Sequence, residues 1–447
     1  MNMLDQSELT HRAAALVAAA GKAGADSADA VSVRSISLSV DVRLGKLEET
    51  SRAEGDDVTL RAFVGTKSAT ASANVLTSDP AELAERAVAM ARAAPDDKFA
   101  GLADPDRIAR SFDDLDLLDD QMPSAQDLTE IAVKAEDAAI AVDGVSKSAG
   151  ASSGWSLGGL VLATSHGFTG SYLASRYGIS ASAIAGEGTT MERDYDYENR
   201  VFRADLPDPE TIGRNAGERA VKRLNPRKIP TGRTTVVYHP RVASGLLGHL
   251  AGAINGAAIA RGTSFLREFM SKQVFGSDIR ITDDPLVPRG LASRPFDGEG
   301  VAGGPIDFVR DGILQQWLLD SASARELGLE TNGRASRGGG NPSPGATNLT
   351  LQPGDITPEN LMSSIKNGLY VTELIGHGVN PVTGDYSRGA AGFVIEDGHI
   401  GYPVSEVTIA GNLRDMFLAL RPANDLTDRF RINAPTVAIE GLTLAGG

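Results

Sequence analysis

The first part of the chain alternates between helical and extended hydrophobic patterns. Leucines and alanines recur at helical spacing over Glu8–Ala20, with Ser7 as the expected N-cap. Apolar and polar residues then alternate from Val31 to Val42, around a possible break at Arg34–Ser35. A further extended segment is predicted over Val58–Val64. This order indicates one helix followed by strands.

Two further helices are predicted from their N-terminal caps. Asp79 stands before Pro80, which suits the first helical position, so a helix is expected to about residue 93 with Glu82 as the capping-box partner. Ser124 is the expected cap of a helix over Ala125–Val142. Short β-prone stretches follow, at Val145–Ala149, Leu160–Thr164, Gly170–Arg176 and Ile179–Ala185.

The last half of the chain is rich in predicted strands. A helix over Pro209–Leu224 leads into a proline- and glycine-containing linker at 226–232. Tight hairpins are expected at Asp311-Gly312 and at Asp397-Gly398. Further strands are predicted at Thr234–Tyr238, Ile279–Thr282, Leu349–Leu351, Leu369–Leu374, Glu406–Ile409 and Thr436–Ile439.

These patterns predict an α+β protein with three domains, at residues 1–110, 111–230 and 231–447. The N-terminal α/β region is expected to pack helices on mixed sheets. The C-terminal domain is expected to be β-rich and barrel-like with an embedded helix. That helix lies in Val242–Ala260, whose four glycines, His249 and Asn255 favour a packed helix over a membrane span.

Composition and charge limit the classes of function that the chain can have. The net charge of −15 argues against a nucleic-acid binder, because phosphate contacts need clustered lysine and arginine. The acidic run over 113–120 is either a solvated connection or a docking site for a basic partner. The first ten residues lack the basic start of a signal peptide, so we expect a cytoplasmic protein without a membrane segment.

The histidines give little sign of a metal site. None of the six is followed by glutamate, as a helical zinc-protease motif requires, and there is no cysteine to supply a thiolate. A catalytic zinc site would have to be built from scattered residues. His249 is more typical of a hydrogen-bonded core or interface histidine than of a ligand.

Two short motifs suggest other chemistry. Gly154-Trp155-Ser156-Leu157-Gly158 matches the nucleophile elbow of serine hydrolases, but β-prone residues follow it, so we expect a hairpin there. Residues 298–303 match the glycine pattern of dinucleotide-binding loops, but a strand rather than a helix is expected next. The serine hydrolase using Ser156 remains a minor alternative.

Glycines mark the remaining candidate sites. Gly248, Gly252 and Gly256 recur every four residues, which predicts a bare helix face that either packs tightly or lines a substrate or partner groove. Two polar, glycine-rich loops, at 338–348 and 376–389, resemble peptide-binding loops in composition. Their candidate binding residues are Asn341, Asn348, His377, Asn380, Asp385, Tyr386, Ser387 and Arg388, beside His249 on the helix.

Several stretches together resemble the TldD/PmbA family, once called modulators of DNA gyrase, and specifically its TldE/PmbA branch. They cover essentially the whole chain in order: Met191–Tyr195, Leu224–Lys228, Gly248–Ile254, Gly290–Asp297, Gln316–Leu319, Thr383–Phe393 and Tyr402–Leu413. The last two stretches are the most specific.

The resemblance implies a TldD–TldE heterodimer that acts as a zinc metalloprotease on unfolded peptides, in peptide-antibiotic maturation or antitoxin degradation. In such a pair the TldD-type subunit carries a His-Glu-x-x-x-His helix and a late cysteine as zinc ligands. Anchored on Arg261–Ser264, those helix positions fall here on Leu247, Gly248 and Gly252. The resemblance therefore implies a chain with no metal of its own, and zinc in the partner.

Alternatives to this interpretation remain open. The chain could be a regulatory or peptide-binding homodimer without a protease partner, or it could form a homodimer only when its partner is missing. A TldD-like gene encoding His-Glu-x-x-x-His in the same genome would favour the protease subunit.

Overall fold

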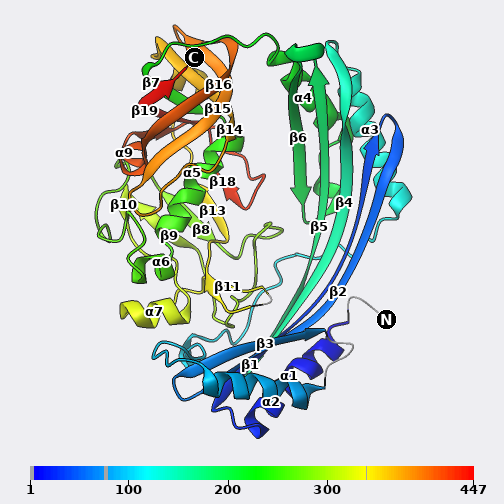
Figure 1. Ribbon diagram of the computed structural model, residues 1–447, viewed down its shortest axis with the longest axis vertical. Coiled ribbons are helices and arrows are strands. Elements are labelled where there is room, and N and C mark those ends of the chain that lie inside the picture. The colour runs from blue at the N-terminus through cyan, green and yellow to red at the C-terminus, as the bar shows by residue number, and fades with distance from the viewer. Residues whose placement is uncertain (1–4, 75–78, 339, 447) are drawn as a thin grey trace.

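Six long antiparallel strands form one half of the molecule. The computed structural model describes residues 5–74, 79–338 and 340–446. The strands follow the order β3-β2-β1-β4-β5-β6 (Figure 1). Because β1 pairs with β4, the predicted regions 1–110 and 111–230 share one sheet. The strands are β1 (Ser27–Arg43), β2 (Lys46–Val64), β3 (Lys67–Asn74), β4 (Val145–Thr164), β5 (Thr169–Ala185) and β6 (Glu192–Arg200).

Four helices cover one face of this sheet. Helices α1 (Ser7–Lys22) and α2 (Pro80–Ala93) pack at one end, while α3 (Ala125–Ile140) and α4 (Pro209–Lys222) pack at the other (Figure 1). In β5 the odd-numbered residues Ile179 and Ala181 meet α3 and α4. Since strand side chains alternate, the even-numbered residues of β5 lie on the opposite, helix-free face.

Of the predicted N-caps of α1, α2 and α3, those of α2 and α3 are confirmed. Asp79 accepts a hydrogen bond from the Ala81 N–H rather than forming a capping box with Glu82, and Ser124 forms a capping box with Asp127. The predicted Ser7 cap is wrong. Gln6 is the N-cap of α1, and the Ser7 N–H donates to the Asp5 carboxylate instead.

The predicted breaks within the long strands are also wrong. Residues 154–158 lie in the middle of β4 and form no hairpin, and β1 continues through Arg34–Ser35. Both segments have a hydrogen-bonded partner strand on each side, so the ladders extend them beyond what their serines and glycines favour locally. The actual turn between β4 and β5 follows Thr164.

The other half of the molecule contains a closed five-stranded barrel. Its strands pair in the cycle β16-β15-β14-β7-β19, and β19 returns to β16. The α+β class and the barrel-like C-terminal region are therefore confirmed. These strands are β7 (Gly232–Tyr238), β14 (Asn367–Ile375), β15 (Asp385–Glu396), β16 (His399–Asn412) and β19 (Val437–Ala445), with β17 (Leu420–Pro422) added at β19.

A second sheet lies beside the barrel in the order β10-β9-β8-β13-β18. Its strands are β8 (Ile281–Asp284), β9 (Ile306–Arg310), β10 (Ile313–Leu314), β13 (Asn348–Leu351) and β18 (Ile432–Asn433), and β11 (Ala335–Ser336) pairs separately with β12 (Ser343–Pro344). The helices of this half are α5 (Pro240–Ala253), α6 (Gly256–Ala260), α7 (Ser321–Leu327), α8 (Pro358–Met362) and α9 (Leu413–Leu418).

Two predicted hairpins are confirmed by their backbone angles. Asp311 and Gly312 join β9 to β10 with φ of 53° and 71°, and Asp397 and Gly398 join β15 to β16 with φ of 48° and 83°. Both turns use the left-handed region at consecutive residues, which Asp-Gly tolerates. In the part of the chain that the structure describes, no helix is long and apolar enough to cross a membrane.

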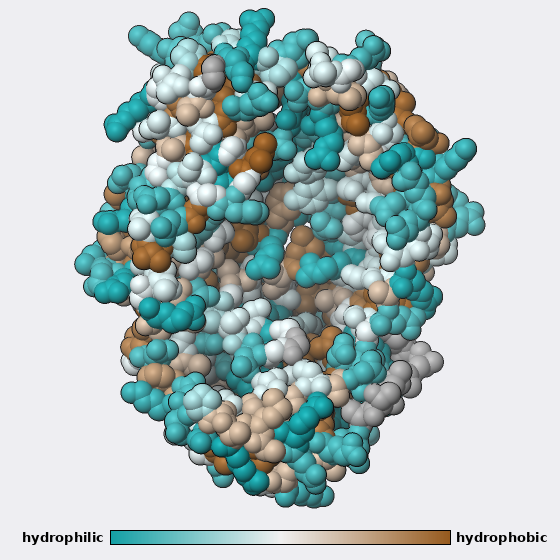
Figure 2. All heavy atoms as spheres, in the orientation of Figure 1, coloured by the Kyte–Doolittle hydropathy of each residue, from teal (hydrophilic) through white to brown (hydrophobic). Residues whose placement is uncertain are grey.

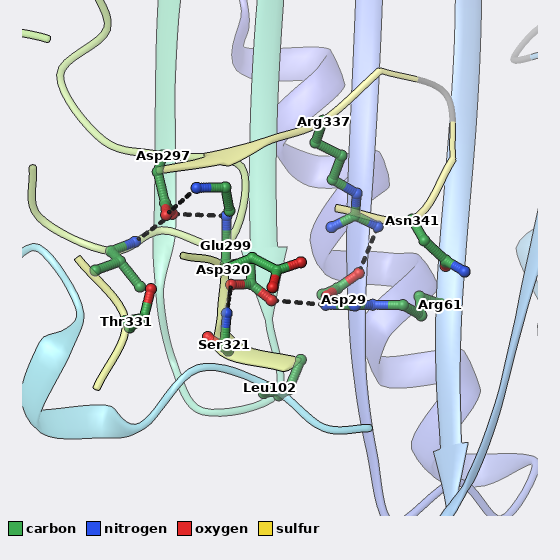
Figure 3. Close-up of polar contacts among 12 residues, drawn as sticks. Asp29, Arg61, Leu102, Asp297, Glu299, Asp320, Ser321, Thr331, Arg337 and Asn341 are labelled. Carbon is green, nitrogen blue, oxygen red and sulfur yellow. Dashed lines mark hydrogen bonds and ion pairs between the residues drawn. The ribbon is translucent and has the colours of Figure 1, made fainter. Parts of the chain in front are cut away.

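The two halves are joined by ion pairs at both ends of the space between them. At one end, Arg241 at the start of α5 holds Asp194 of β6 through two hydrogen bonds of 2.8 and 3.1 Å. At the other end, Arg337 donates to Asp29 of β1 at 2.6 Å, and Arg61 holds the second oxygen of that carboxylate (Figure 3). These contacts fix how the sheet faces the C-terminal half.

Candidate functional site

A cleft separates the helix-free face of the long sheet from helix α5. The space-filling view is hollowed between the two halves (Figure 2). A cavity of about 660 Å³ lies in this region. It is lined by Arg176, Tyr197 and Asn199 from the sheet, by Ser244, Gly245 and Gly248 from α5, and by Leu291, Ala292, Phe430, Arg431 and Ile432. The cavity therefore takes its walls from both halves of the molecule.

Helix α5 turns a bare face toward solvent. Its leucines are buried in the core of the C-terminal half, whereas Gly245, Gly248 and Gly252 are exposed. A Cβ added at any of these three glycines would meet no atom within 4 Å. Within this chain, these three glycines therefore leave open space and do not pack tightly against another element.

Gly256 behaves differently from the other glycines. Helix α5 ends at Ala253, so Gly256 begins the separate helix α6 and does not continue the bare face. A Cβ on Gly256 would lie 2.7 Å from the Leu318 carbonyl oxygen. The prediction of one continuous glycine face over Gly248–Gly256 is wrong at its last member, since the chain turns at Asn255.

His249 lies beside the bare face but packs inward. Its ring makes an edge-on contact with Tyr386, with centroids 6.0 Å apart. Burial, together with the nearby charge of Arg388, lowers the pKa of His249. The structure thus brings together three residues that the sequence suggested separately, namely His249, Tyr386 and Arg388. A neutral imidazole is the favoured form in this position.

Two candidate asparagines hold loops in place. The Asn348 side chain donates to the Asp284 carbonyl and to the Ser293 hydroxyl, and accepts from the Ala292 N–H, at 2.7–3.0 Å. Asn348 therefore fixes the turn that carries Leu291 into the cleft wall. Asn341 lies far from this turn, where it accepts a hydrogen bond from Thr70 of β3.

The predicted loop at 376–389 is only partly a loop. Residues from Asp385 onward belong to β15, and Tyr386 is buried at 2% exposure. His377, Asn380 and Ser387 are exposed. Asn380 accepts from the Val382 N–H, and Asp385 accepts from the Thr383 hydroxyl, so both shape the turn before the strand. None of these residues lines the cavity beside α5.

The donor atoms on this chain do not fit the zinc site that the sequence resemblance implies for the partner subunit. Among residues 5–74, 79–338 and 340–446, no group of three or more histidine, aspartate or glutamate side chains could hold a metal ion. His239 is instead used as the N-cap of α5, where its Nδ1 accepts from the Arg241 N–H. At the anchored helix positions, Leu247 is buried in the core, while Gly248 and Gly252 have no side chain.

The serine hydrolase alternative finds no support in this geometry. Ser156 lies within a continuous strand, paired with Ser37 of β1 and Arg176 of β5, whereas a nucleophile elbow needs a sharp turn into a helix. The glycine pattern at 298–303 forms a loop followed by β9, as expected, so no helix N-terminus is available there for a pyrophosphate.

Sequence reasoning missed the arginines of the cleft. Arg176 is on the helix-free face of β5, and its guanidinium donates to the Leu291 carbonyl across the cleft. Arg431 donates to the Ala346 carbonyl at 3.4 Å. Arg176 stands just before Tyr177, Ile179 and Ala181, which alternate with small or polar residues, and this alternation was the available signal. Nothing in the sequence near Arg431 indicated that it would line the same cavity as Arg176.

A second polar cluster joins β1 and β2 of the long sheet to loops of the C-terminal half (Figure 3). Glu299 accepts from the Ser321 N–H at 2.8 Å and lies 3.8 Å from Arg61. Burial, and then the nearby Asp297 carboxylate, raise the pKa of Glu299 to about 7, against the opposing influence of Arg61. The cluster is an ionic joint between the halves and contains a carboxyl group that titrates near neutral pH.

Comparisons with known proteins agree over nearly the whole chain. Three family models match: PmbA/TldA metallopeptidase domain 1 at residues 28–91, the central domain at 119–224 and the C-terminal domain at 231–446. A metalloprotease PmbA from Escherichia coli O157:H7 is 37% identical over 97% of this chain and 94% of its own length.

Solved structures share the fold. A candidate modulator of DNA gyrase from Bacteroides thetaiotaomicron superposes with a TM-score of 0.90 at 26% identity, covering 99% of both chains. TldE from Thermococcus kodakarensis superposes with a TM-score of 0.86 at 21% identity, covering 97% of this chain and all of its own, which is a likeness of fold.

Proposed function

Because the chain belongs to the PmbA/TldD metallopeptidase family, we propose that it is the metal-free TldE/PmbA-type subunit of a heterodimeric zinc metalloprotease. Its partner would be a TldD-type subunit that binds the zinc. The substrates would be unfolded peptides or small proteins, in roles such as peptide-antibiotic maturation or antitoxin degradation. A cytoplasmic location fits a chain without cysteine.

Helix α5 is the observation that carries the proposal. It borders the cleft, as an active-site helix would, but the positions that the family resemblance assigns to zinc ligands and general base are Leu247, Gly248 and Gly252. None of these side chains can bind a metal or activate water. The helix therefore supports a role in shaping the cleft, and hydrolysis would occur on the partner.

The test combines the purified chain with the TldD-type protein of the same genome. Bound zinc and hydrolysis of an unstructured peptide are measured for each protein alone and for the mixture. We expect zinc in the partner only, and peptide hydrolysis that depends on both proteins and stops with a chelator. Stoichiometric zinc and chelator-sensitive hydrolysis in this chain alone would overturn the proposal.

A regulatory or peptide-binding homodimer is the competing function. It predicts that the chain self-associates and binds peptide, and that adding it leaves the partner's hydrolysis unchanged. Sedimentation of the chain alone and of the mixture separates the two, because the proposed subunit forms a one-to-one complex with the TldD-type protein.

A further inference from the structure

The cleft beside α5 contains two arginines that have no carboxylate partner among the residues that the structure describes. Arg176 and Arg431 both line the cavity, and both side chains are exposed to solvent. Among the described residues, their hydrogen-bond acceptors are backbone carbonyls, those of Leu291 and Ala346. A guanidinium has five N–H groups, so both arginines keep donors free for a ligand.

In two neighbouring cavities, unlike this one, the arginines are paired with carboxylates. The cavity of about 530 Å³ next to this one also contains arginines, but Arg289 is paired with Asp116 and Asp205, and Arg200 is paired with Glu198. In the cavity at the start of α5, Arg241 is paired with Asp194 and Arg219 with Asp196. In these two cavities the four arginines named are paired with acids, whereas the contacts among the described residues give Arg176 and Arg431 no carboxylate.

The two positive charges act on each other. Partial burial, and then the charge of Arg431, lower the pKa of Arg176. Two guanidinium groups that line one cavity repel each other, and an anion bound between them would relieve that repulsion. The site therefore has the electrostatics of an anion receptor that is incomplete without its ligand.

The walls around the arginines suit one end of a peptide. Tyr197 and Phe430 pack together with centroids 5.4 Å apart, and with Leu291 they provide an apolar surface beside the charges. On the other side, Gly245 and Gly248 leave room for a backbone to approach α5 closely. A carboxylate next to an apolar side chain fits both features.

We infer that Arg176 and Arg431 bind a carboxylate of a peptide that lies in the cleft along α5. The inference rests on the proposed function in taking peptides as the ligands. The carboxylate could be the C-terminus of the peptide or the side chain of an aspartate or glutamate. A site of this kind would give the metal-free subunit a direct part in selecting and aligning substrate.

Binding of labelled peptides to the full-length chain, measured by fluorescence anisotropy at low salt, tests this directly. Three otherwise identical unstructured peptides are compared, one with a free C-terminus, one amidated, and one amidated with an internal glutamate. We expect the amidated neutral peptide to bind about 10-fold or more weakly than the best carboxylate peptide. The two carboxylate peptides show whether the C-terminus or a side chain is the ligand.

Variants assign the effect to the two arginines. Arg176→Gln and Arg431→Gln are each expected to remove most of the preference for a carboxylate, and Arg176→Lys to retain part of it, because lysine keeps the charge but not the forked donors. Arg421→Gln is the matched control, since Arg421 pairs with Glu440 away from the cavity. Thermal melts check that each variant is folded. If one of the two variants does not fold, the variant at the other position still tests the inference.

Equal affinity of the wild-type chain for all three peptides would overturn the inference. So would a carboxylate preference that survives both Arg176→Gln and Arg431→Gln. The measurement uses the chain without its partner and without zinc. Failure of the heterodimer proposal would therefore appear in the mixing experiment, while carboxylate selectivity would be measured here independently.

Discussion

Glu299 is a single residue whose charge should set part of the pH dependence of stability. Its pKa is raised to about 7 by burial and by Asp297, so the folded chain holds this proton more tightly than the unfolded chain does. Between the ordinary glutamate pKa and about 7, the folded state binds more protons, and stability therefore falls as pH rises.

We predict that Glu299→Gln removes this part of the slope. Glutamine keeps an acceptor for the Ser321 N–H but cannot ionise. Relative to wild type, the variant should gain roughly 1–3 kcal/mol in free energy of unfolding between pH 5 and pH 8. Urea unfolding at a series of pH values measures the slope.

Glu440→Gln controls for the loss of one carboxylate, because Glu440 lies on the surface beside Arg421. If Glu299→Gln and the wild-type chain show parallel pH profiles over this range, Glu299 does not titrate there. The expected result is a difference confined to the Glu299 variant.

At the scale of one element, helix α5 and the following α6 give opposite expectations for glycine substitutions. Gly248→Ala places a methyl group where no atom lies within 4 Å, and alanine favours a helix by about 1 kcal/mol over glycine. We predict that Gly248→Ala raises the free energy of unfolding by up to about that amount.

Gly256→Ala is the matched control, because its Cβ would lie 2.7 Å from the Leu318 carbonyl and 2.9 Å from the Ser323 hydroxyl. It should lower stability by about 1–3 kcal/mol, the usual range for overpacking. Denaturant unfolding of both variants measures the two signs. A loss of stability at Gly248 equal to that at Gly256 would show that α5 is closely covered.

Elements with local signals were predictable from the sequence. The hairpins at Asp311-Gly312 and Asp397-Gly398 depend on residues that tolerate the left-handed region, and Ser124 satisfies the N-terminus of α3 locally. The long strand β4 was not predicted, because residues 154–158 are held extended by β1 and β5, which are distant in sequence. Strand length here is set by tertiary pairing.

The candidate site also has parts that were predictable from local sequence and parts that were not. The glycines of α5 were found because their spacing is visible in the sequence, whereas the bend at Asn255 that removes Gly256 from the face was not. Arg176 and Arg431 are 255 residues apart in the sequence and line the same cavity only in the folded chain. Pairs of this kind have no local signature.

At the scale of the whole molecule, the cleft depends on ionic joints at its two ends. Asp194 of β6 is held by Arg241 and lies 3.4 Å from Arg223, which also pairs with Glu373 of β14. Although burial opposes ionisation, the hydrogen bonds and charge of Arg241 hold the pKa of Asp194 below its ordinary value. Its contribution is therefore present above the ordinary aspartate pKa and is lost as pH falls through the folded pKa.

We predict that Asp194→Asn loosens this end of the cleft. It leaves the largely buried Arg241 without its charge partner, which costs about 3–5 kcal/mol when one member of a buried pair is removed. Hydrogen exchange should rise in β6 and in the first turn of α5, and the acid-dependent loss of stability should be smaller than in wild type.

Asp307→Asn is the control, because Asp307 also contacts two arginines, Arg280 and Arg310, but all three lie in the C-terminal half. If both variants raise exchange equally across β6 and α5, the joint at Asp194 is not what holds the sheet against the helix. A selective effect of Asp194→Asn would mean that this contact holds β6 against the start of α5, beside the separate pairing of Arg429 with Glu198 of β6.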